Sequence, residues 1–447
     1  MLIFKNKIMK NLYILLGALF FVTACEKNDL DQTPPLDAAA SSLTSFEEVL
    51  NAAYYYQQAS ATPLAIMGDF RADNMQMDEE PYPAFDRFNS DLAGGDLVEQ
   101  FFRPFYSNLY KSILSSNNIV TNSIEEKQVA EAKFLRALSY FKLVKAFGDV
   151  TVNLSASPAI EDKSSLARTA ASEVYNNVII PDFQEAIANL DNSEIASGSA
   201  SNIAARGMLA KVYMQRGNFS AAEAELATVL SDAAGAGISL QENFADIFNS
   251  DLNSEIIFAT QLSTSINDEY GFTGFPGWFS GGDTKSLEPL DQDLVDAFDA
   301  SPGDLRRDLT VTDSTSTSPK FVLGLEQDWI ELRLGDVVLL YAEALNENGN
   351  TEAALVELNK IRNRAGLDNS TSTTQAEVRK AIADERRLEL ALEGQRWFDL
   401  VRTGTVEAEM GEPINSNYYI FPIPNSEVLA SDGVITQNAG YWFWAFD

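Results

Sequence analysis

Residues 203–230 read IAARGMLAKVYMQRGNFSAAEAELATVL, and this stretch decides the fold. Small and apolar residues recur at helical spacing on both sides of a Gly-Asn break, which predicts two helices joined by a tight turn. The order of small, aromatic and turn residues is typical of a tetratricopeptide repeat, in which paired helices interlock. The matching positions are Leu209, Tyr213, Gly217, Ala222 and Leu226. The stretch therefore predicts one tetratricopeptide-like helix pair.

Three further stretches repeat this pattern with decreasing regularity. Around 333–365, Tyr341 and Leu345 precede an Asn-Gly-Asn turn, and Leu358 and Ile361 follow it. Because one pair cannot bury its own apolar face, several copies indicate a continuous scaffold. We expect a mainly α fold: an α-α superhelix of about four tetratricopeptide-like pairs, with long irregular loop excursions and a few short strands. The expected pairs lie near 46–122, 129–190, 202–231 and 333–365.

The amino-terminal segment has the pattern of a lipoprotein signal. Three lysines precede the apolar run Leu12–Val22, and Cys25, the only cysteine of the chain, follows Thr-Ala. The apolar run is too short for the about 20 residues that a membrane-spanning helix needs. We therefore expect a signal peptide over 1–24, lipidation of Cys25, a tether over 25–44 and a single domain over 45–447.

Composition restricts the ligand. The formal net charge is −33 over 447 residues, and it becomes more negative once the lysines of the signal peptide are removed. Nucleic-acid binding requires clustered Lys and Arg, so nucleic acid is excluded as a partner. Histidine is absent, which removes His-dependent nucleophiles and His-ligated metal sites. Calcium at the acidic stretch Asp291–Asp299 was considered, but the EF-hand spacing is missing. We expect a neutral ligand, no cofactor and no metal.

Residues 385–402, ERRLELALEGQRWFDLVR, together with four shorter stretches, resemble the SusD/RagB family of starch-utilisation-system D-like proteins. The shorter stretches are FGDV at 147–150, RLGDVVLLYAEA at 333–344, FPIP at 421–424 and QNAGY at 437–441. The resemblance runs through nearly the whole chain. It implies a non-enzymatic lipoprotein, lipid-anchored at the cell-surface side of the outer membrane, that binds an oligosaccharide or polysaccharide. It also implies a SusC-like TonB-dependent transporter as the partner that receives the glycan. The family's sugar contacts lie in variable loops, so no residue transfers from it directly.

The chemistry of a neutral sugar points to the loops of the expected ligand-binding part, 62–96 and 232–330. A sugar needs an aromatic plane for its C–H face and polar side chains for its hydroxyl edge. The segment 271–283, GFTGFPGWFSGGD, offers Trp278 for stacking, with Phe279 and Asp283 beside it. The alternative is that the phenylalanines of this segment anchor the loop to the scaffold.

The segment 69–88, DFRADNMQMDEEPYPAFDRF, is the second candidate. We expect its polar residues to hold hydroxyls and its aromatic residues to add stacking surface, although Asp73 and Asn74 also suit a turn cap. The candidate contacts are Arg71, Asp73, Asn74, Tyr82 and Phe85. Trp329 is a further candidate, for which packing is the favoured alternative.

The charges of 385–402 favour ion pairs within the scaffold over catalysis. They combine Arg386, Arg387, Arg396 and Arg402 with Glu385, Glu389, Glu393 and Asp399. The first interpretation is glycan capture for a transporter, with a β-glucan as the specific candidate because of the aromatic content and the acidic surface. The alternative is a tetratricopeptide lipoprotein scaffold that binds proteins in outer-membrane assembly. A glycoside hydrolase is disfavoured, because 65 acidic residues supply carboxylate pairs everywhere and none stands out.

Overall fold

The computed structural model describes residues 46–158, 163–263, 274–280, 289–312 and 317–441, which belong to one compact unit, Phe46–Asp447. The expected signal peptide, Cys25 and the tether lie outside the described residues. None of the described helices combines the length and the hydropathy that a membrane span requires.

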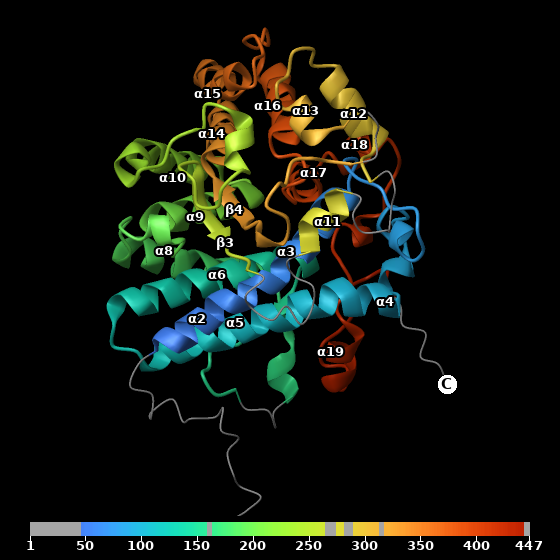
Figure 1. Cartoon of the computed structure of the whole chain (residues 1–447). Helices are drawn as coiled ribbons and strands as arrows, with labels where there is room; N and C mark the ends of the chain where they lie inside the picture. Colours follow the sequence, from blue (N-terminus) through green and yellow to red (C-terminus); the bar gives the residue numbers. More distant parts are fainter. Residues whose placement is uncertain (1–45, 159–162, 264–273, 281–288, 313–316, 442–447) are drawn as a thin grey trace, which may run out of the picture. The chain divides into compact units, whose positions relative to one another are not determined.

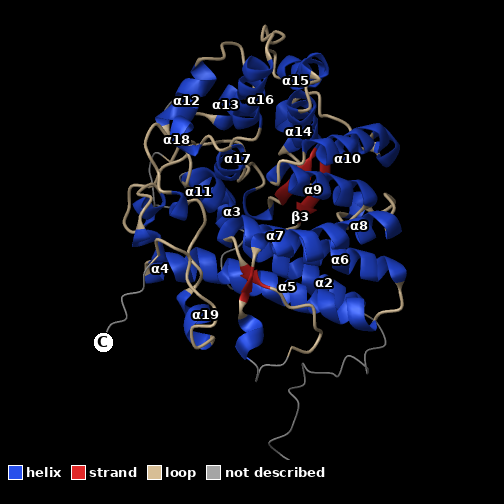
Figure 2. Ribbon diagram, turned by 180° about the vertical axis from the view of Figure 1, so that it is seen from behind, coloured by secondary structure: helices blue, strands red, loops and turns tan. Residues whose placement is uncertain are grey.

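Three long helices form one end of the scaffold, α2 (Glu47–Gln57), α5 (Arg103–Asn122) and α6 (Glu126–Phe147). They lie side by side in Figures 1 and 2. A buried amide joins all three, because Gln57 Nε2 donates to Ser112 Oγ at 2.9 Å and to Ser139 Oγ at 2.6 Å. Gly148 ends α6 with a φ of 72°, a conformation that glycine adopts without strain.

The next layer packs on α6 through α8 (Ile180–Asn189), which follows α7 (Ala171–Val174) and the π-helical segment η8 (Tyr175–Ile179). Arg136 on α6 and Asp182 on α8 form two hydrogen bonds, of 2.7 and 2.9 Å, and both side chains are buried. Phe134 and Phe183 meet edge to face with their ring centroids 5.6 Å apart. Helices α6 and α8 therefore pack on each other although a long connection separates them.

The two most regular pairs continue the series. They are α9 (Asn202–Gln215) with α10 (Phe219–Asp232), and α14 (Leu334–Glu347) with α15 (Thr351–Arg364). Helix α10 packs on α14, so the pairs are stacked one on the next, as Figure 1 shows from α6 to α15. Gly217 and Gly349 turn the chain between paired helices with φ values of 66° and 87°.

The segment 385–402 adds a further helical layer. Helix α16 (Gln375–Glu389) packs on α14 and α15, and α17 (Arg396–Thr403) follows after a short turn. Thr374 and Glu377 form a capping box at the start of α16, which satisfies two amide groups of its first turn. Two short helices, α18 (Val406–Glu409) and α19 (Asn425–Ala430), end the described fold.

Short strands fill the space between the helices (Figure 2). Strands β3 (Ile256–Thr260) and β4 (Trp329–Arg333) pair antiparallel and are buried along their whole length. Strands β1 (Val150–Thr151) and β2 (Arg168–Thr169) form a smaller antiparallel pair. The remaining short helices include α3 (Ala61–Ala65), η3 (Ile66–Phe70), η4 (Tyr82–Phe85), η5 (Ser90–Ala93), α4 (Gly95–Leu97), η6 (Val98–Phe102), α11 (Phe275–Phe279), α12 (Gln292–Asp299) and α13 (Arg307–Thr310).

The mainly helical superhelix with few short strands is confirmed. The loop-rich stretch expected over 62–96 begins with helical turns. Residues 62–70 continue α3 into η3, and both segments are buried. The residues 61–70, ATPLAIMGDF, are mostly small or apolar, so they form helical turns that pack into the core.

Candidate ligand-binding site

Trp278 does not present an open ring. It lies on the short helix α11, is only 7% exposed and meets other aromatic rings on three sides. Its ring centroid lies 5.4 Å from that of Tyr82, 5.6 Å from that of Phe101 and 6.4 Å from that of Phe70. The prediction that this indole stacks on a sugar is therefore wrong, because the apolar surface of η3 and η6 offers it a packed environment.

The neighbouring aromatic candidates are buried in the same way. Phe279 stacks on Phe70 with a centroid distance of 5.8 Å, and Phe85 meets Phe101 at the same distance. Trp329 packs edge to face on Phe275 at 5.1 Å, as its favoured alternative predicted. All of these rings belong to the core, so they anchor the loops and are closed to a ligand. Asp283 lies outside the described residues.

Arg71 is fully buried and is held by backbone and rings. Its guanidinium carbon lies 4.2 Å from the ring centroid of Phe88 and 5.4 Å from that of Trp397. It donates to the carbonyl oxygen of Tyr418 at 2.9 Å and to that of Phe85. Burial lowers the pKa of Arg71 to about 10. Arg71, which we expected to bind hydroxyls, therefore links the 69–88 segment to the C-terminal part of the chain.

Asp73 and Asn74 join the same segment to the arginines of 385–402. Asp73 accepts two hydrogen bonds of 2.7 Å from Arg396. Burial raises the pKa of the Asp73 carboxyl, but Arg396 and Arg387 outweigh burial and hold it below its ordinary value. Asn74 donates to Asp69 at 2.9 Å and accepts from Arg387 at 3.1 Å. Both residues are structural here, so their predicted role in binding hydroxyls is wrong.

The ion pairs predicted for 385–402 are present, and they are deeply buried. Glu389 accepts from Arg333 at 2.6 Å and from Arg306 at 2.9 Å, while Glu393 accepts from Arg333 at 2.8 Å. Arg364 also pairs with Glu389. Burial raises the pKa of Glu389, but the three arginines outweigh burial and hold it far below its ordinary value. The sequence did not reveal Arg306 and Arg333 as partners, because they come from segments distant along the chain.

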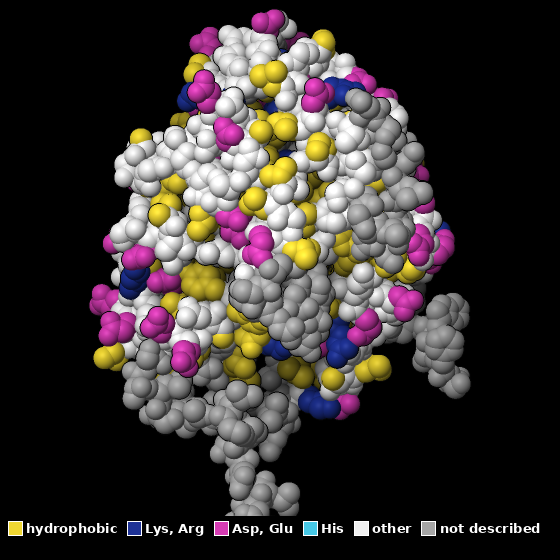
Figure 3. Space-filling view, in the orientation of Figure 1, with side chains coloured by type: hydrophobic (Ala, Val, Ile, Leu, Met, Phe, Trp, Pro, Cys, Tyr) yellow, Lys and Arg dark blue, Asp and Glu magenta, His cyan; other side chains and the backbone are white. Residues whose placement is uncertain are grey.

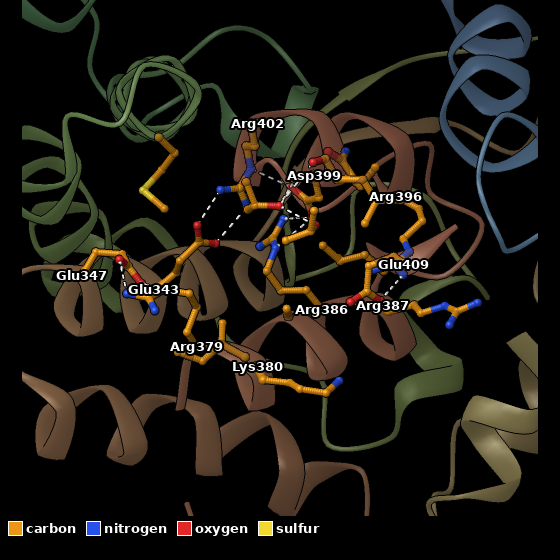
Figure 4. A pocket seen from close by; sticks show the side chains of 18 of the residues that line it. Glu343, Glu347, Arg379, Lys380, Arg386, Arg387, Arg396, Asp399, Arg402 and Glu409 are labelled. Carbon is orange, nitrogen blue, oxygen red and sulfur yellow. Dashed lines mark hydrogen bonds and ion pairs between the residues drawn. The ribbon is translucent and has the colours of Figure 1, made fainter. Parts of the chain in front are cut away.

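A cavity of about 350 Å³ runs along α16 and α17, and Figure 4 shows its charged wall. Arg402 donates to both carboxylate oxygens of Glu343, at 2.5 and 2.8 Å. Arg379 binds Glu347 in the same way, at 2.6 and 2.7 Å. Because its arginines are already paired with carboxylates, this wall is close to neutral and exerts little pull on a charged ligand.

A second cavity, of about 510 Å³, has a different lining. Among the described residues that line it there is no Lys or Arg, and hydroxyl, amide and tyrosine groups predominate. Tyr106 and Tyr110 on α5 contribute two rings with centroids 4.8 Å apart and planes inclined by 45°. The Tyr110 hydroxyl donates to the Thr151 carbonyl at 2.7 Å, which ties α5 to the β1 side of the cavity. We name this space the tyrosine cavity.

The other described walls of the tyrosine cavity combine polar side chains with the apolar residues Val152, Pro158, Leu166 and Ile435. Ser107 lies between the two tyrosines in sequence, Asn153 follows β1, and Glu427 comes from α19. Burial raises the pKa of Glu427 above its ordinary value, and Arg103 opposes that shift. Sequence reasoning missed the cavity. The only local signal was Tyr106 and Tyr110 four residues apart on one face of a predicted helix.

A metal site is not formed by the side chains that the structure describes, since no group of three or more Asp, Glu, His or Cys residues is arranged to hold an ion. The acidic stretch considered for calcium is instead a helix start. Asp291 accepts from the amide of Asp293 at 2.8 Å and caps α12.

The chain is similar to proteins of one family. The family model described as "SusD family" matches residues 310–416, and the model described as "Starch-binding associating with outer membrane" matches residues 28–214. SusD-like protein P2 of Formosa agariphila is 27% identical, with 75% of this chain and 80% of that protein covered.

Solved structures share the fold. A laminarin-binding SusD-like protein is 24% identical with a TM-score of 0.68, and the match covers 89% of this chain and 99% of that chain. Surface glycan-binding protein A from Bacteroides fluxus is 22% identical with a TM-score of 0.72, over 89% of this chain and 99% of that chain. The buried tetratricopeptide-like scaffold, the ERR to RWFDL segment, both family matches and the curated relative together support a SusD/RagB family protein.

Proposed function

We propose that this protein is a non-enzymatic glycan-binding lipoprotein that captures an oligosaccharide or polysaccharide in the tyrosine cavity. The observation that carries the proposal is the lining of that cavity. The half-buried ring of Tyr110, which packs on the buried Tyr106, supplies aromatic surface, and Ser107, Asn153 and Glu427 supply donors and acceptors for hydroxyls. The volume of about 510 Å³ lies within the range of small-molecule sites.

The captured glycan is neutral. The chain carries a formal charge of −33, Asp and Glu side chains dot the face shown in Figure 3, and the described lining of the cavity holds a carboxylate but no cation. These charges repel uronate and sulfate groups, whereas they do not weaken the binding of uncharged hydroxyl groups. A β-glucan is the first candidate, and the laminarin-binding relative supports that choice.

The proposed binding is weak and reversible. Hydroxyl-edge hydrogen bonds and ring contacts in an open cavity correspond to a dissociation constant between about 1 μM and 1 mM, or about 4 to 8 kcal/mol. Such a ligand leaves readily, which suits its transfer to a transporter. We propose a SusC-like TonB-dependent transporter as the receiving partner.

The location follows from the amino-terminal segment. Lipidation of Cys25 anchors the protein in the outer membrane, and the tether 25–44 places the domain on the outer surface of the cell. The family model whose description names outer-membrane association supports this placement. Mass spectrometry of the mature amino terminus tests the anchor: a diacylated or triacylated Cys25 is expected, and an unmodified thiol contradicts it.

A charge-sorted glycan panel tests the ligand class. Calorimetry with laminarin and maltoheptaose as neutral glycans, and with alginate and a sulfated galactan as acidic ones, measures affinity at low and at physiological salt. We expect binding within the neutral group alone. Preference for an acidic glycan contradicts the neutral-ligand proposal, and hydrolysis seen in a reducing-end assay contradicts the non-enzymatic one.

The cavity along α16 and α17 (Figure 4) favours a second candidate function, the binding of protein segments by the tetratricopeptide-like helices α14 and α16. Part of its lining is apolar, as in a groove that binds peptides, and this part includes Met214, Phe219 and Ile382. Protease treatment of intact cells separates the candidates. A surface glycan-binding protein is digested, and a scaffold that faces the periplasm survives.

A further inference from the structure

Three lysines gather where α6 faces α9, and two of them have carboxylate partners. Lys142 donates to Glu331 at 2.5 Å and to Ser60 at 2.8 Å. Lys211, on α9, donates to Asp336 at 2.8 Å. Ion pairs of this kind offset the loss of hydration that each ammonium group suffers on burial.

Lys145 is the third lysine, and within the described part of the chain it has neither a hydrogen bond nor an ion pair. Its Nζ lies 4.4 Å from the ring centroid of Phe398 and 5.2 Å from that of Phe141. Burial lowers the pKa of Lys145 to about 7, and the positive charge of Lys211 adds to that effect. The rings give the ammonium group some electrostatic support, but they provide no acceptor atom.

Two small cavities flank this amine, each of about 20 Å³. Lys145, Lys211, Phe141 and Gln395 line both of them. A space of this size admits one water molecule or one monatomic ion and is too small for sulfate, phosphate or a sugar.

The carboxylates around Lys145 are all engaged by other cations. Glu331 pairs with Lys142, and Asp336 is shared by Lys211 and Arg386. Asp399 is shared by Arg386 and Arg402, and Glu343 also pairs with Arg402. When Lys145 is protonated, this cluster holds five cations against four carboxylates, Glu331, Asp336, Glu343 and Asp399. The excess positive charge lies at the two small cavities.

We propose that Lys145 and Lys211 form a binding site for a small monatomic anion of the halide class, such as chloride. The ammonium groups donate to the anion, and the amide of Gln395 lies on the same walls. Because the charged ammonium form binds an anion more strongly than the neutral amine does, anion binding raises the pKa of Lys145, and proton uptake accompanies binding near and above pH 7. The site is separate from the tyrosine cavity and does not depend on glycan binding.

Bromide tests the site directly. Crystals of the protein grown in sodium bromide at pH 6 are measured at the bromine absorption edge, and we expect an anomalous peak in contact with Lys145 Nζ. The same experiment on Lys145→Met gives no peak. A wild-type crystal with only water in both cavities overturns the proposal.

A titration in solution provides an independent readout that requires no variant to fold. The ¹³Cε resonance of Lys145 is followed against pH in sodium chloride and in sodium gluconate at equal ionic strength. At a chloride concentration ten times the dissociation constant, the midpoint rises by about 1 pH unit. The exposed Lys380, which pairs with Asp384, serves as the control and shows the same midpoint in both salts. Equal midpoints for Lys145 overturn the proposal.

Discussion

Asp73 and Arg396, 323 positions apart in the chain, form two hydrogen bonds of 2.7 Å between one carboxylate and one guanidinium. This bidentate pair fastens the 69–88 segment to the start of α17. Arg387 adds a contact of 3.1 Å to the same carboxylate. The segment proposed from sequence as a ligand-binding loop is therefore part of the frame.

Asp73→Asn tests this fastening. It leaves Arg387 without a carboxylate partner and leaves the buried Arg396 with Glu409 alone, so we expect a loss of about 3 kcal/mol in the free energy of unfolding. Urea denaturation followed by circular dichroism measures it. Asp384→Asn breaks an exposed pair with Lys380 and serves as the control, with an expected change of about 1 kcal/mol or less. Equal effects of both substitutions contradict the frame role.

Trp278→Ala separates packing from binding. The indole is buried among three rings, so its removal is expected to destabilise the fold by about 3 to 5 kcal/mol. Glycan affinity of the folded protein stays unchanged, because the ring does not line the tyrosine cavity. Thermal denaturation and calorimetry measure the two effects. A variant that keeps its stability and loses its affinity restores Trp278 as a sugar contact.

Gly68 lies so close to the backbone of Gly394 that it does not tolerate a side chain. A Cβ on Gly68 would approach the carbonyl carbon of Gly394 to 2.3 Å. We expect Gly68→Ala to lower the free energy of unfolding by about 2 kcal/mol or more, since the backbones must separate. Gly277→Ala is the matched control, because a Cβ there meets no atom within 4 Å. Denaturant midpoints of the two variants should differ clearly, and coinciding midpoints would refute the close approach.

Ionisation of Asp86 lowers the free energy of unfolding as the pH rises. Burial raises the pKa of its carboxyl from 3.8 to about 8, with Arg71 opposing and with Asp291 and Asp78 reinforcing the shift. The folded state thus binds the proton more tightly than the unfolded state, so stability falls as pH rises from about 4 to about 8. Asp86→Asn removes this slope and raises the melting temperature more at pH 9 than at pH 5. If the melting temperatures of Asp86→Asn and wild type differ by the same amount at pH 5 and at pH 9, the assignment is contradicted.

The sequence predicts those parts of the fold that depend on local periodicity. The helices around Tyr213 and Tyr341 were located because apolar spacing and turn glycines identify a tetratricopeptide pair without knowledge of the rest of the chain. The scaffold role of Arg386 and Arg396 also followed from charges that alternate within one segment. A local pattern does not show which residue a charged side chain pairs with. Arg333, for example, meets Glu389 only in the folded chain.

The candidate site shows the same limit. A glycine-rich loop suggested an exposed Trp278, but the decisive quantity is the apolar surface that the folded chain presents to it, from Phe70 and Phe101. The tyrosine cavity needs α5, the residues after β1, and α19, and these meet only through tertiary packing. The expectation of a neutral ligand rests on composition and charge, which do not depend on which residues become neighbours, and it stays a prediction.

Obstruction of the tyrosine cavity is the most direct test of the account. Ser107→Trp places an indole into the cavity, and Ser115→Trp places the same side chain elsewhere on α5, outside it. Calorimetry with the tightest-binding neutral glycan of the panel compares both variants with wild type, after circular dichroism has established that they are folded. We predict at least a tenfold loss of affinity for Ser107→Trp and wild-type affinity for Ser115→Trp. A folded Ser107→Trp protein that binds the glycan as tightly as wild type would contradict capture in this cavity.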